Sequence, residues 1–357
     1  FATAPGNSTS VVAAFFTAVS AVCITGLTVV DTATHWSGFG QLVIMVLIQL
    51  GGLGIVSFAT LLGLLISGRI SLRDRLNTLS EAKIVGADSL PKLLSRILIV
   101  YFGFELVLAT YLSLRLHFSY DEGVFQSIWH GTFHAISAFN NGGFSLYTDS
   151  MTGFNQDMFF IAPVMLAVVV GGLGFPVLIE LHERIWRLRL QPGGKAKRFS
   201  LHTRLTLWMT VSLIVLGALF IGAIEWNNPG TLGGLNTWDK LVNTFFTSIM
   251  PRSGGFNSLD ISAMDPASWL GIDLLMFIGG GSASTAGGIK VTTIAVLIFI
   301  IYTEIRGETA VNVGNRRLPR SIQRQALTLV ALSATAILLT TLLFAATTDF
   351  SLDEILF

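Results

Sequence analysis

The sequence predicts an all-α protein that crosses a membrane several times and repeats one helical unit along the chain. Composition is the first observation: 52% of the 357 residues are hydrophobic and only 12% are charged, about half the charged share of a soluble domain. The second is a series of long apolar stretches, and the third is a glycine motif that recurs at a regular spacing. The net charge of +1 gives no reason to expect a nucleic-acid partner.

Six apolar stretches are long enough to cross a bilayer, for which a helix needs roughly 20 residues. They lie at about 41–66, 96–118, 157–181, 205–225, 268–302 and 325–348. Three further apolar stretches, at 11–22, 125–139 and 238–250, are too short to span and are typical of re-entrant helices. We therefore expect short helices that enter the membrane between spanning ones.

The distribution of charge predicts the orientation. Eighteen of the 22 Lys and Arg residues fall in the loops 67–96, 182–204 and 303–324, which the positive-inside rule places in the cytoplasm. The short apolar stretches then lie on the outer side. Thirteen of the 21 acidic residues lie in or beside outer segments, which predicts an acidic vestibule that concentrates cations.

A glycine motif follows each short stretch. Segments 16–28, 134–145 and 245–257 each read as an apolar helix pattern, a polar or glycine pair, glycine, Leu or Phe, and a small polar residue. The central glycines are Gly26, Gly143 and Gly255, which are 117 and 112 residues apart. A second glycine cluster trails each motif, at 51–54, 171–174 and 279–288.

This spacing divides the chain into repeats at 1–95, 96–204, 205–322 and 323–357. Each full repeat consists of a spanning helix, a short outer helix with its glycine turn, and a second spanning helix. A fourth central glycine would fall near position 370, beyond the last residue. We therefore expect the first repeat to lack its leading helix and the fourth to end at the start of its short helix.

Glycine turns at membrane depth indicate a path for ions. Irregular backbone survives there only where it is buried in protein or lines a water-filled cavity, and glycine tolerates the left-handed conformations that aim carbonyls at a common axis. Rings of carbonyl oxygens replace the hydration shell of a K⁺-sized ion. Such a site needs no redox or covalent step, so we expect no enzyme activity and no cofactor in this chain.

Several motifs resemble those of a known family. Segments 19–31, 49–54, 137–144 and 252–257 and the loop 279–290 are similar to pore motifs of the Trk/Ktr/HKT superfamily of potassium transporters, and the region around Gly26 is most similar to the KtrB-type bacterial membrane subunit. The resemblance implies four M1–P–M2 units, as in K⁺ channels, around one pseudo-fourfold pore. The K⁺ selectivity filter would be formed by carbonyls of Ile24, Thr25, Gly26, Asn141, Gly142, Gly143, Ser253, Gly254 and Gly255.

The third glycine cluster differs from the first two because it is a poor helix by propensity, which favours an unwound loop. The resemblance implies that this loop is an intramembrane gate below the filter. Lys290 follows it, and two roles stay open for its ammonium: repelling K⁺ or pairing with an acid. The gate residues are Gly279, Gly280, Gly281, Ser282, Ala283, Ser284, Thr285, Ala286, Gly287, Gly288 and Lys290.

The resemblance also implies partners and a location. It implies a homodimer in the bacterial plasma membrane and a KtrA-like cytosolic ring that binds ATP or ADP, with Na⁺ as a candidate activator. The ring would dock on loops 182–204 and 303–324, where Arg316, Arg317 and Arg320 are candidate contacts.

A secondary transporter and an intramembrane enzyme are the alternatives to a channel-like pore. A secondary cation transporter, Trk-type or Na⁺-coupled, would also explain glycine-rich spans around a midplane site, but inverted repeats are typical of that class and these repeats share one topology. An intramembrane enzyme would need a catalytic pair at membrane depth.

Glu105, an acid inside a predicted span, could face a cavity or a subunit contact. Arg252 could brace the filter from behind or reach the membrane surface.

Overall fold

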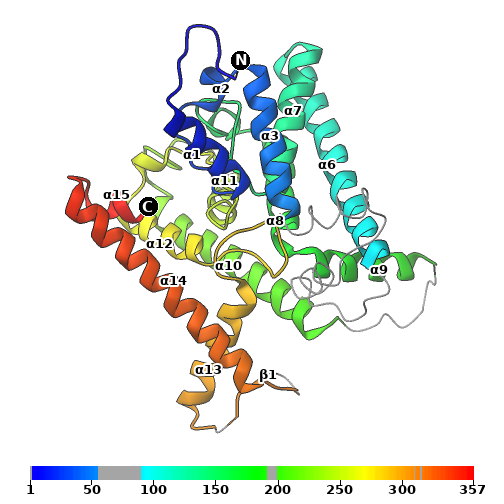
Figure 1. Ribbon diagram of the computed structural model, residues 1–357, viewed down its shortest axis with the longest axis vertical. Coiled ribbons are helices and arrows are strands. Elements are labelled where there is room, and N and C mark those ends of the chain that lie inside the picture. The colour runs from blue at the N-terminus through cyan, green and yellow to red at the C-terminus, as the bar shows by residue number, and fades with distance from the viewer. Residues whose placement is uncertain (1, 55–89, 191–198, 309, 314–315) are drawn as a thin grey trace.

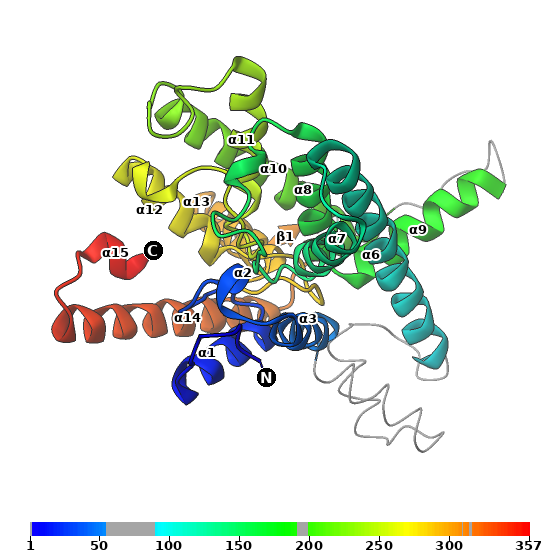
Figure 2. The same ribbon diagram turned by 90° about the horizontal axis from the view of Figure 1, so that it is seen from above.

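The computed structural model describes residues 2–54, 90–190, 199–308, 310–313 and 316–357, and these residues are mostly helical. Viewed from above, the helices of successive repeats follow one another around a central region, from α1 and α3 through α6–α8 and α10–α13 to α14 and α15 (Figure 2). A two-stranded hairpin lies beside α13, to its right in the view of Figure 1.

The terms first, second and third repeat are used below for residues 1–95, 96–204 and 205–322. The first repeat contains α1 (Val11–Val22), α2 (Thr32–His35) and α3 (Gly38–Leu53), and the second contains α6 (Leu90–Tyr120), α7 (Val124–Phe139), α8 (Met158–Leu173) and α9 (Phe175–Leu190). The third contains α10 (Leu201–Glu225), α11 (Thr237–Ile249), α12 (Pro266–Phe277), α13 (Val291–Ile305), β1 (Asn312–Val313) and β2 (Arg316–Arg317). α14 (Arg320–Thr347) and α15 (Leu352–Leu356) follow, and single 3₁₀ turns lie at Thr152–Phe154 and Ile261–Ala263.

Polar caps explain where many of these helices begin. Side-chain oxygens of Ser10, Ser37, Asp157, Ser200 and Asn236 accept backbone N–H groups in the first turns of α1, α3, α8, α10 and α11. Each cap satisfies donors that the helix itself leaves unpaired. The short helices α1, α7 and α11 coincide with the apolar stretches 11–22, 125–139 and 238–250, and α7 begins after Gly123 without a side-chain cap.

Among the described residues, three helices are long and apolar enough to span a membrane: Ile97–Tyr120, Leu201–Glu225 and Arg320–Thr347. They correspond to the predicted spans 96–118, 205–225 and 325–348. The predicted span 268–302 is divided into α12 and α13 by a non-helical segment, residues 278–290, so the expected unwinding is confirmed.

The predicted span over 157–181 is long and apolar enough, but it is broken into two helices. α8 and α9 meet at an angle of 107°, and the residue between them, Gly174, has a left-handed φ of +93°. A Cβ on Gly174 would lie 2.3 Å from the carbonyl oxygen of Ser282, so close packing of the 279–288 loop also requires glycine here.

In the first repeat α3 ends at Leu53 before Gly54, which also has a positive φ. The remainder of the predicted span 41–66 lies outside the described residues, as does most of loop 67–96.

The largest core cluster lies around the second repeat. It joins Tyr101 and Leu112 of α6, Phe139 of α7 and Phe160 of α8 with Phe246 of α11. The second and third short outer helices are thereby packed against a common interior, and this holds their carboxyl-terminal turns in place.

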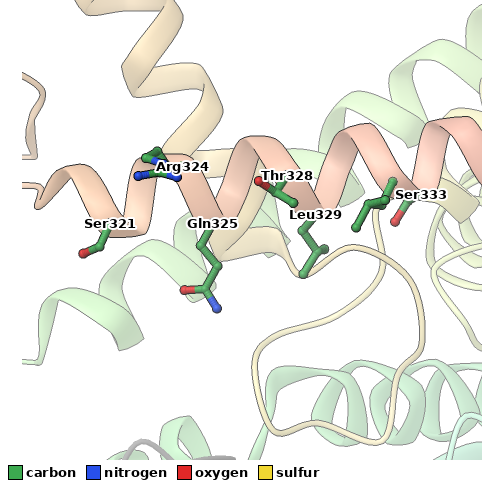
Figure 3. A pocket seen from close by; sticks show the side chains of 7 residues that line it. Ser321, Arg324, Gln325, Thr328, Leu329 and Ser333 are labelled. Atoms are coloured by element: carbon green, nitrogen blue, oxygen red, sulfur yellow. The ribbon is translucent and has the colours of Figure 1, made fainter.

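α14 contrasts with this core because most of its residues are exposed and its described packing is against α13 and α15. A pocket of about 500 Å³ runs along one side of it (Figure 3). Its lining residues all belong to this one helix: Ser321, Arg324, Gln325, Thr328, Leu329, Leu332 and Ser333. None of the predicted filter or gate residues lines this pocket.

Candidate functional site

The three central glycines lie against one another although they are far apart in sequence. A Cβ placed on Gly143 would lie 3.0 Å from Cα of Gly255 and 3.3 Å from Cα of Gly26. A Cβ on Gly26 would lie 3.0 Å from the carbonyl oxygen of Gly142. The turns 24–26, 141–143 and 253–255, called here the first, second and third glycine turns, therefore meet at one place.

The three turns share one backbone conformation. The central glycines have φ values of +77°, +72° and +75°. Two residues earlier, Ile24, Asn141 and Ser253 also have positive φ, at 56°, 58° and 81°. Side-chain-bearing residues rarely adopt this region, and such strain is concentrated at functional sites.

A serine supports the first two turns from within their own repeats. The hydroxyl of Ser20 donates to the carbonyl oxygen of Leu27 at 2.7 Å, and that of Ser137 donates to the carbonyl oxygen of Phe144 at the same distance. Both serines lie six residues before the central glycine. The third repeat has Ile249 at this position, which carries no such donor.

The second turn is held from behind by a buried polar network. The Nδ2 group of Asn140 donates to Oε1 of Glu105 at 2.8 Å and to the carbonyl oxygen of Ile136 at 2.8 Å. The Nε2 group of Gln49 donates to Oε2 of Glu105 at 2.8 Å. The hydroxyl of Tyr101 donates to Oδ1 of Asn140. Glu105 is therefore buried, at 5% exposed, and bonded within this network.

The third turn is held by Arg252, which is only 7% exposed. Its guanidinium donates to the carbonyl oxygens of Gly279 at 3.1 Å and Thr210 at 3.5 Å. Of its two predicted roles, these contacts support bracing, because the side chain points inward and not toward the surface. The hydroxyl of Ser253 also accepts the N–H of Gly287 at 2.9 Å, so two bonds join this turn to the 279–288 loop.

The 279–288 loop is fixed to the break between α8 and α9. The N–H of Gly281 donates to the carbonyl oxygen of Gly172 at 2.7 Å, and the N–H of Phe175 donates to that of Ala283 at 3.0 Å. The hydroxyl of Thr285 donates to the carbonyl oxygen of Phe139 at 3.2 Å. Backbone polar groups that would be unpaired in an unwound segment are thus satisfied by the second repeat.

The two ends of this loop also meet. The N–H of Gly279 donates to the carbonyl oxygen of Ile289 at 3.0 Å, and the N–H of Ile289 donates to that of Phe277 at 3.1 Å. Lys290 Nζ donates to the carbonyl oxygen of Ala286 at 2.6 Å. In the described residues its ammonium therefore contacts a carbonyl of the loop, and no salt bridge to an acid is formed there.

Outer segments link neighbouring repeats. Thr148 donates to Asp31 Oδ2 at 2.9 Å, and the N–H of Met151 donates to the carbonyl oxygen of Asn257 at 2.9 Å. Partial burial opposes ionisation of Asp31, but hydrogen bonds from Thr34, Ala33 and Thr148 outweigh it, so the pKa of this carboxyl lies below its usual value.

Asp260 is likewise acidic. Hydrogen bonds from the Ser262 side chain and N–H lower its pKa. Asp31 and Asp260 therefore carry negative charge at neutral pH on the side where the sequence predicts an acidic vestibule.

Sequence reasoning missed several of these residues. Gln49, Tyr101 and the two supporting serines carry no motif signal of their own, although the serines recur at one offset from the central glycine. Gly174 had a usable signal, because it repeats the position of Gly54 after the same Gly-Gly-Leu triplet. The remaining contacts depend on segments that only tertiary structure brings together.

Comparison with known proteins places this geometry in context. Residues 2–357 match the family model TrkH, described as "Cation transport protein". The Ktr system potassium uptake protein B of Bacillus subtilis (strain 168) is 40% identical over 319 residues, which cover 88% of this chain and 68% of that protein. The Ktr system potassium uptake protein B of Vibrio alginolyticus is 33% identical over 98% of this chain and 74% of its own length.

A further relative and a solved structure are also similar to this chain. The potassium/sodium uptake protein NtpJ of Enterococcus hirae is 34% identical over 91% of this chain and 69% of its own length. The crystal structure of the potassium transporter TrkH from Vibrio parahaemolyticus superimposes with a TM-score of 0.68 at 18% identity, covering 96% of this chain and 67% of that one. At this identity the superposition shows a shared fold.

Proposed function

We propose that this chain, which belongs to the TrkH family of cation transport proteins, carries potassium ions into bacterial cells through a pore lined by backbone carbonyls. The observation that carries the proposal is the meeting of three glycine turns with one backbone conformation. Relatives named potassium uptake proteins support the choice of ion. The proposal is transport across the plasma membrane by a multi-pass protein, without enzyme activity or a cofactor in this chain.

The proposed selectivity filter consists of the predicted residues in the three glycine turns, with an M1–P–M2 arrangement for each repeat. The repeats would be those at 1–95, 96–204, 205–322 and 323–357. Carbonyl oxygens around Gly26, Gly143 and Gly255 would replace the water around K⁺. The buried side chains Asn140 and Arg252 support this assignment because their hydrogen bonds hold the second and third turns from behind.

Replacing Gly255 by serine tests the filter. A Cβ there would lie 2.7 Å from Cα of Gly143, so the turns must shift apart and the K⁺/Na⁺ permeability ratio of the intact protein should fall. The ratio is measured by ion flux in liposomes. Gly153→Ser is the matched control, because a Cβ at Gly153 meets no atom within 4 Å. An unchanged ratio in Gly255→Ser would reject the filter.

The 279–288 loop and Lys290 are the proposed gate. The bonds that join this loop to the third turn and to the α8–α9 break support a segment that occludes the path until they rearrange. Deleting residues 281–286 should raise K⁺ flux, because the bonds of Gly281 and Ala283 to the second repeat are removed. Flux equal to that of the unaltered protein would argue against a gate.

A homodimer with a cytosolic, KtrA-like nucleotide-binding ring is the proposed assembly. β1 and β2 form an antiparallel hairpin that ends in Arg316 and Arg317, and Arg317 and Arg320 are exposed. Part of the other candidate loop, 191–198, lies outside the described residues. Arg317→Glu combined with Arg320→Glu should abolish the response of flux to ATP or ADP while leaving ion selectivity unchanged. A retained nucleotide response would contradict this docking site.

Sodium coupling is the second candidate, as a Trk-type or Na⁺-coupled secondary transporter with a midplane site. It is favoured by one observation, the name potassium/sodium uptake protein of the Enterococcus hirae relative. Under this candidate, K⁺ uptake into liposomes would require Na⁺ on the same side and would carry Na⁺ at a fixed ratio. Sodium that merely activates the pore would raise K⁺ flux without itself being carried.

A further inference from the structure

His134 is a fully buried histidine on α7, nine residues before the central glycine of the second turn. Its imidazole makes two hydrogen bonds whose directions are fixed by the partners. Nδ1 lies 2.8 Å from the carbonyl oxygen of His130, which can only accept, so Nδ1 carries the proton. The N–H of Leu146 donates to Nε2 at 3.2 Å, so Nε2 is the acceptor. The ring is therefore neutral, in the one tautomer that fits both partners.

The bond to Leu146 holds the segment that leaves the second glycine turn. Leu146 comes three residues after Gly143 and is 5% exposed, so its N–H needs an acceptor within the protein. On the same helix the hydroxyl of Ser137 donates to the carbonyl oxygen of Phe144 at 2.7 Å. Residues three apart on a helix lie on one face. One face of α7 thus binds this segment at two points, once through a carbonyl oxygen and once through an N–H group.

The entrance to the same turn is also fixed to α7. The N–H of Asn140, the C-cap, donates to the carbonyl oxygen of Ile136 at 3.0 Å, and the N–H of Gly142 donates to that of Ser137 at 2.7 Å. Because both ends of the turn are attached to one helix, few conformations remain for the residues between them. Release of either end would therefore change the direction in which the carbonyls of the turn point.

Tyr147 limits how the imidazole can move. Its ring stacks on that of His134, with centroids 4.9 Å apart and an interplanar angle of 13°. The N–H of Tyr147 donates to Oγ of Ser145 at 3.0 Å, and this oxygen lies 3.1 Å from Nε2 of His134. Hydrogen bonds at its edge and a ring against its face thus hold the imidazole, which fixes the position of the acceptor.

The other two repeats have no imidazole at this position. Nine residues before their central glycines they have Thr17 and Phe246. The hydroxyl of Thr17 donates to the carbonyl oxygen of Ala13 within α1 at 2.9 Å, and a phenyl ring has no acceptor nitrogen. The residue of the first repeat that corresponds to Leu146 is Val29, which is 53% exposed and so less enclosed. The contact of His134 is therefore specific to the second turn.

We propose that His134 is a positioning residue for the selectivity filter: as a neutral acceptor it fixes the exit of the second glycine turn, and thereby the direction of the turn's carbonyls. The inference rests on the proposed filter and deepens it. Selection between K⁺ and Na⁺ depends on the arrangement of the carbonyl oxygens that replace the hydration shell. A turn that loses one of its attachments should therefore select less well.

His134→Phe in the intact protein removes both hydrogen bonds and keeps a ring that can stack on Tyr147. The K⁺/Na⁺ permeability ratio in liposomes should fall about fivefold, the factor that corresponds to one hydrogen bond. His117→Phe is the matched control, because Nδ1 of His117 also donates to a carbonyl oxygen, that of Glu122, outside the glycine turns. The control should keep the original ratio. An unchanged ratio in His134→Phe would overturn the inference.

His134→Gln provides the rescue. The side-chain oxygen of glutamine can take the place of Nε2 and accept from Leu146, so the ratio should stay within about twofold of the original. A ratio as low as that of His134→Phe would refute the role as acceptor. A role in folding alone predicts lower melting temperatures in both variants with the ratio unchanged, which also overturns the inference.

Solid-state NMR of the unaltered protein tests the tautomer even where the variants accumulate poorly. His134 is the only histidine followed by alanine in the sequence, so labelling of these two residue types assigns its signal. At pH 7 its imidazole should have a protonated Nδ1 and an unprotonated Nε2. A protonated Nε2 could not accept from Leu146 and would overturn the inference.

Failure of this inference is distinguishable from failure of the proposed function. If the unaltered protein carries no K⁺ into liposomes, or if Gly255→Ser keeps the original permeability ratio, the proposed transport or its filter is wrong. If Gly255→Ser lowers the ratio and His134→Phe does not, only the role of His134 is rejected.

Discussion

The second and third glycine turns share one backbone conformation, yet an acidic side chain stands behind one of them and a basic side chain behind the other. Three residues before the central glycine, the second turn has Asn140, which is bonded to the carboxylate of Glu105, and the third has Arg252, which is bonded to two carbonyl oxygens. The first turn has Cys23 at this position, and that side chain is exposed. The residue at this position therefore differs in chemistry and in contacts among the three turns.

The second turn is held mainly by regular helices, whereas the support of the third turn depends on the 279–288 loop. The partners of Asn140 lie on regular helices, α3 and α6, whose own hydrogen bonds keep them in place. One partner of Arg252 is Gly279, at the start of a segment without helical hydrogen bonds. A rearrangement of the 279–288 loop would therefore change the support of the third turn more than that of the second, which the loop contacts through the bond from Thr285 to the Phe139 carbonyl.

The largest effect is expected from Arg252→Met. Loss of the guanidinium bond to the Gly279 carbonyl removes about 1.5–3 kcal/mol of charge-assisted bonding, so the occluded state should be depopulated tenfold or more and K⁺ flux without nucleotide should rise. An apolar residue of similar volume is tolerated where a buried charge stood, so the fold should persist. Liposome flux is the measurement, with exposed Arg204→Met on α10 as control. Unchanged basal flux would show that the third turn is as fixed as the second.

On stability, as distinct from ion flux, the largest effect is expected at neighbouring glycines of α8. A Cβ on Gly171 would lie 1.9 Å from the carbonyl oxygen of Phe139, whereas a Cβ on Gly172 meets nothing closer than 3.4 Å. Gly171→Ala should therefore destabilise the protein by about 3 kcal/mol or more, and Gly172→Ala by far less. Melting temperatures in detergent measure both. In the first repeat the pattern changes, because Gly51 and Gly52 are both crowded; equal tolerance at 52 and 172 would contradict the asymmetry between the repeats.

These glycines also show what the sequence could and could not predict. The short helices, the three straight spans and the unwound loop followed from apolar length and glycine content, because such features depend on local sequence. The bend at Gly174 was missed, since an apolar run of suitable length suggests a straight helix and the bend is fixed by packing against the loop.

In the candidate site, too, some features could be predicted from the sequence and others could not. The glycine turns were identifiable because a backbone requirement repeats three times with the same residue type. Their supports were not, because Glu105 meets Gln49, 56 residues earlier, and Asn140, 35 residues later, and Arg252 bonds to carbonyls that any residue could provide. A backbone carbonyl does not require a particular residue type, so the hydrogen bonds that Arg252 makes to such groups cannot be recognised as a sequence motif.

A smaller effect is expected from the serines that support the first two turns. Ser137→Ala removes the bond to the Phe144 carbonyl and leaves that acceptor buried, because Phe144 is fully buried. The cost should be about 1–3 kcal/mol. Ser20→Ala should cost less, since Leu27 is 58% exposed and water can reach its carbonyl. Thermal unfolding of the two variants measures the difference; a larger loss in Ser20→Ala would show that the first turn is the more enclosed.

The smallest effect is expected where the outer segments of the first two repeats meet. Hydrogen bonding lowers the pKa of Asp31 in the folded protein, so its contribution to stability is present at pH values above about 4, its unfolded pKa, and is lost as the pH falls through the lower folded value. Thr148→Val removes one of the bonds that lower the pKa and should cost less than about 1 kcal/mol at neutral pH, since the pair is exposed. The difference in melting temperature between the two proteins should be constant from pH 5 to 8 and shrink below pH 4, where the protonated carboxyl no longer distinguishes them. A difference that grows on acidification would mean that Thr148 supports the outer loop of its own repeat and not the carboxylate of the neighbouring one.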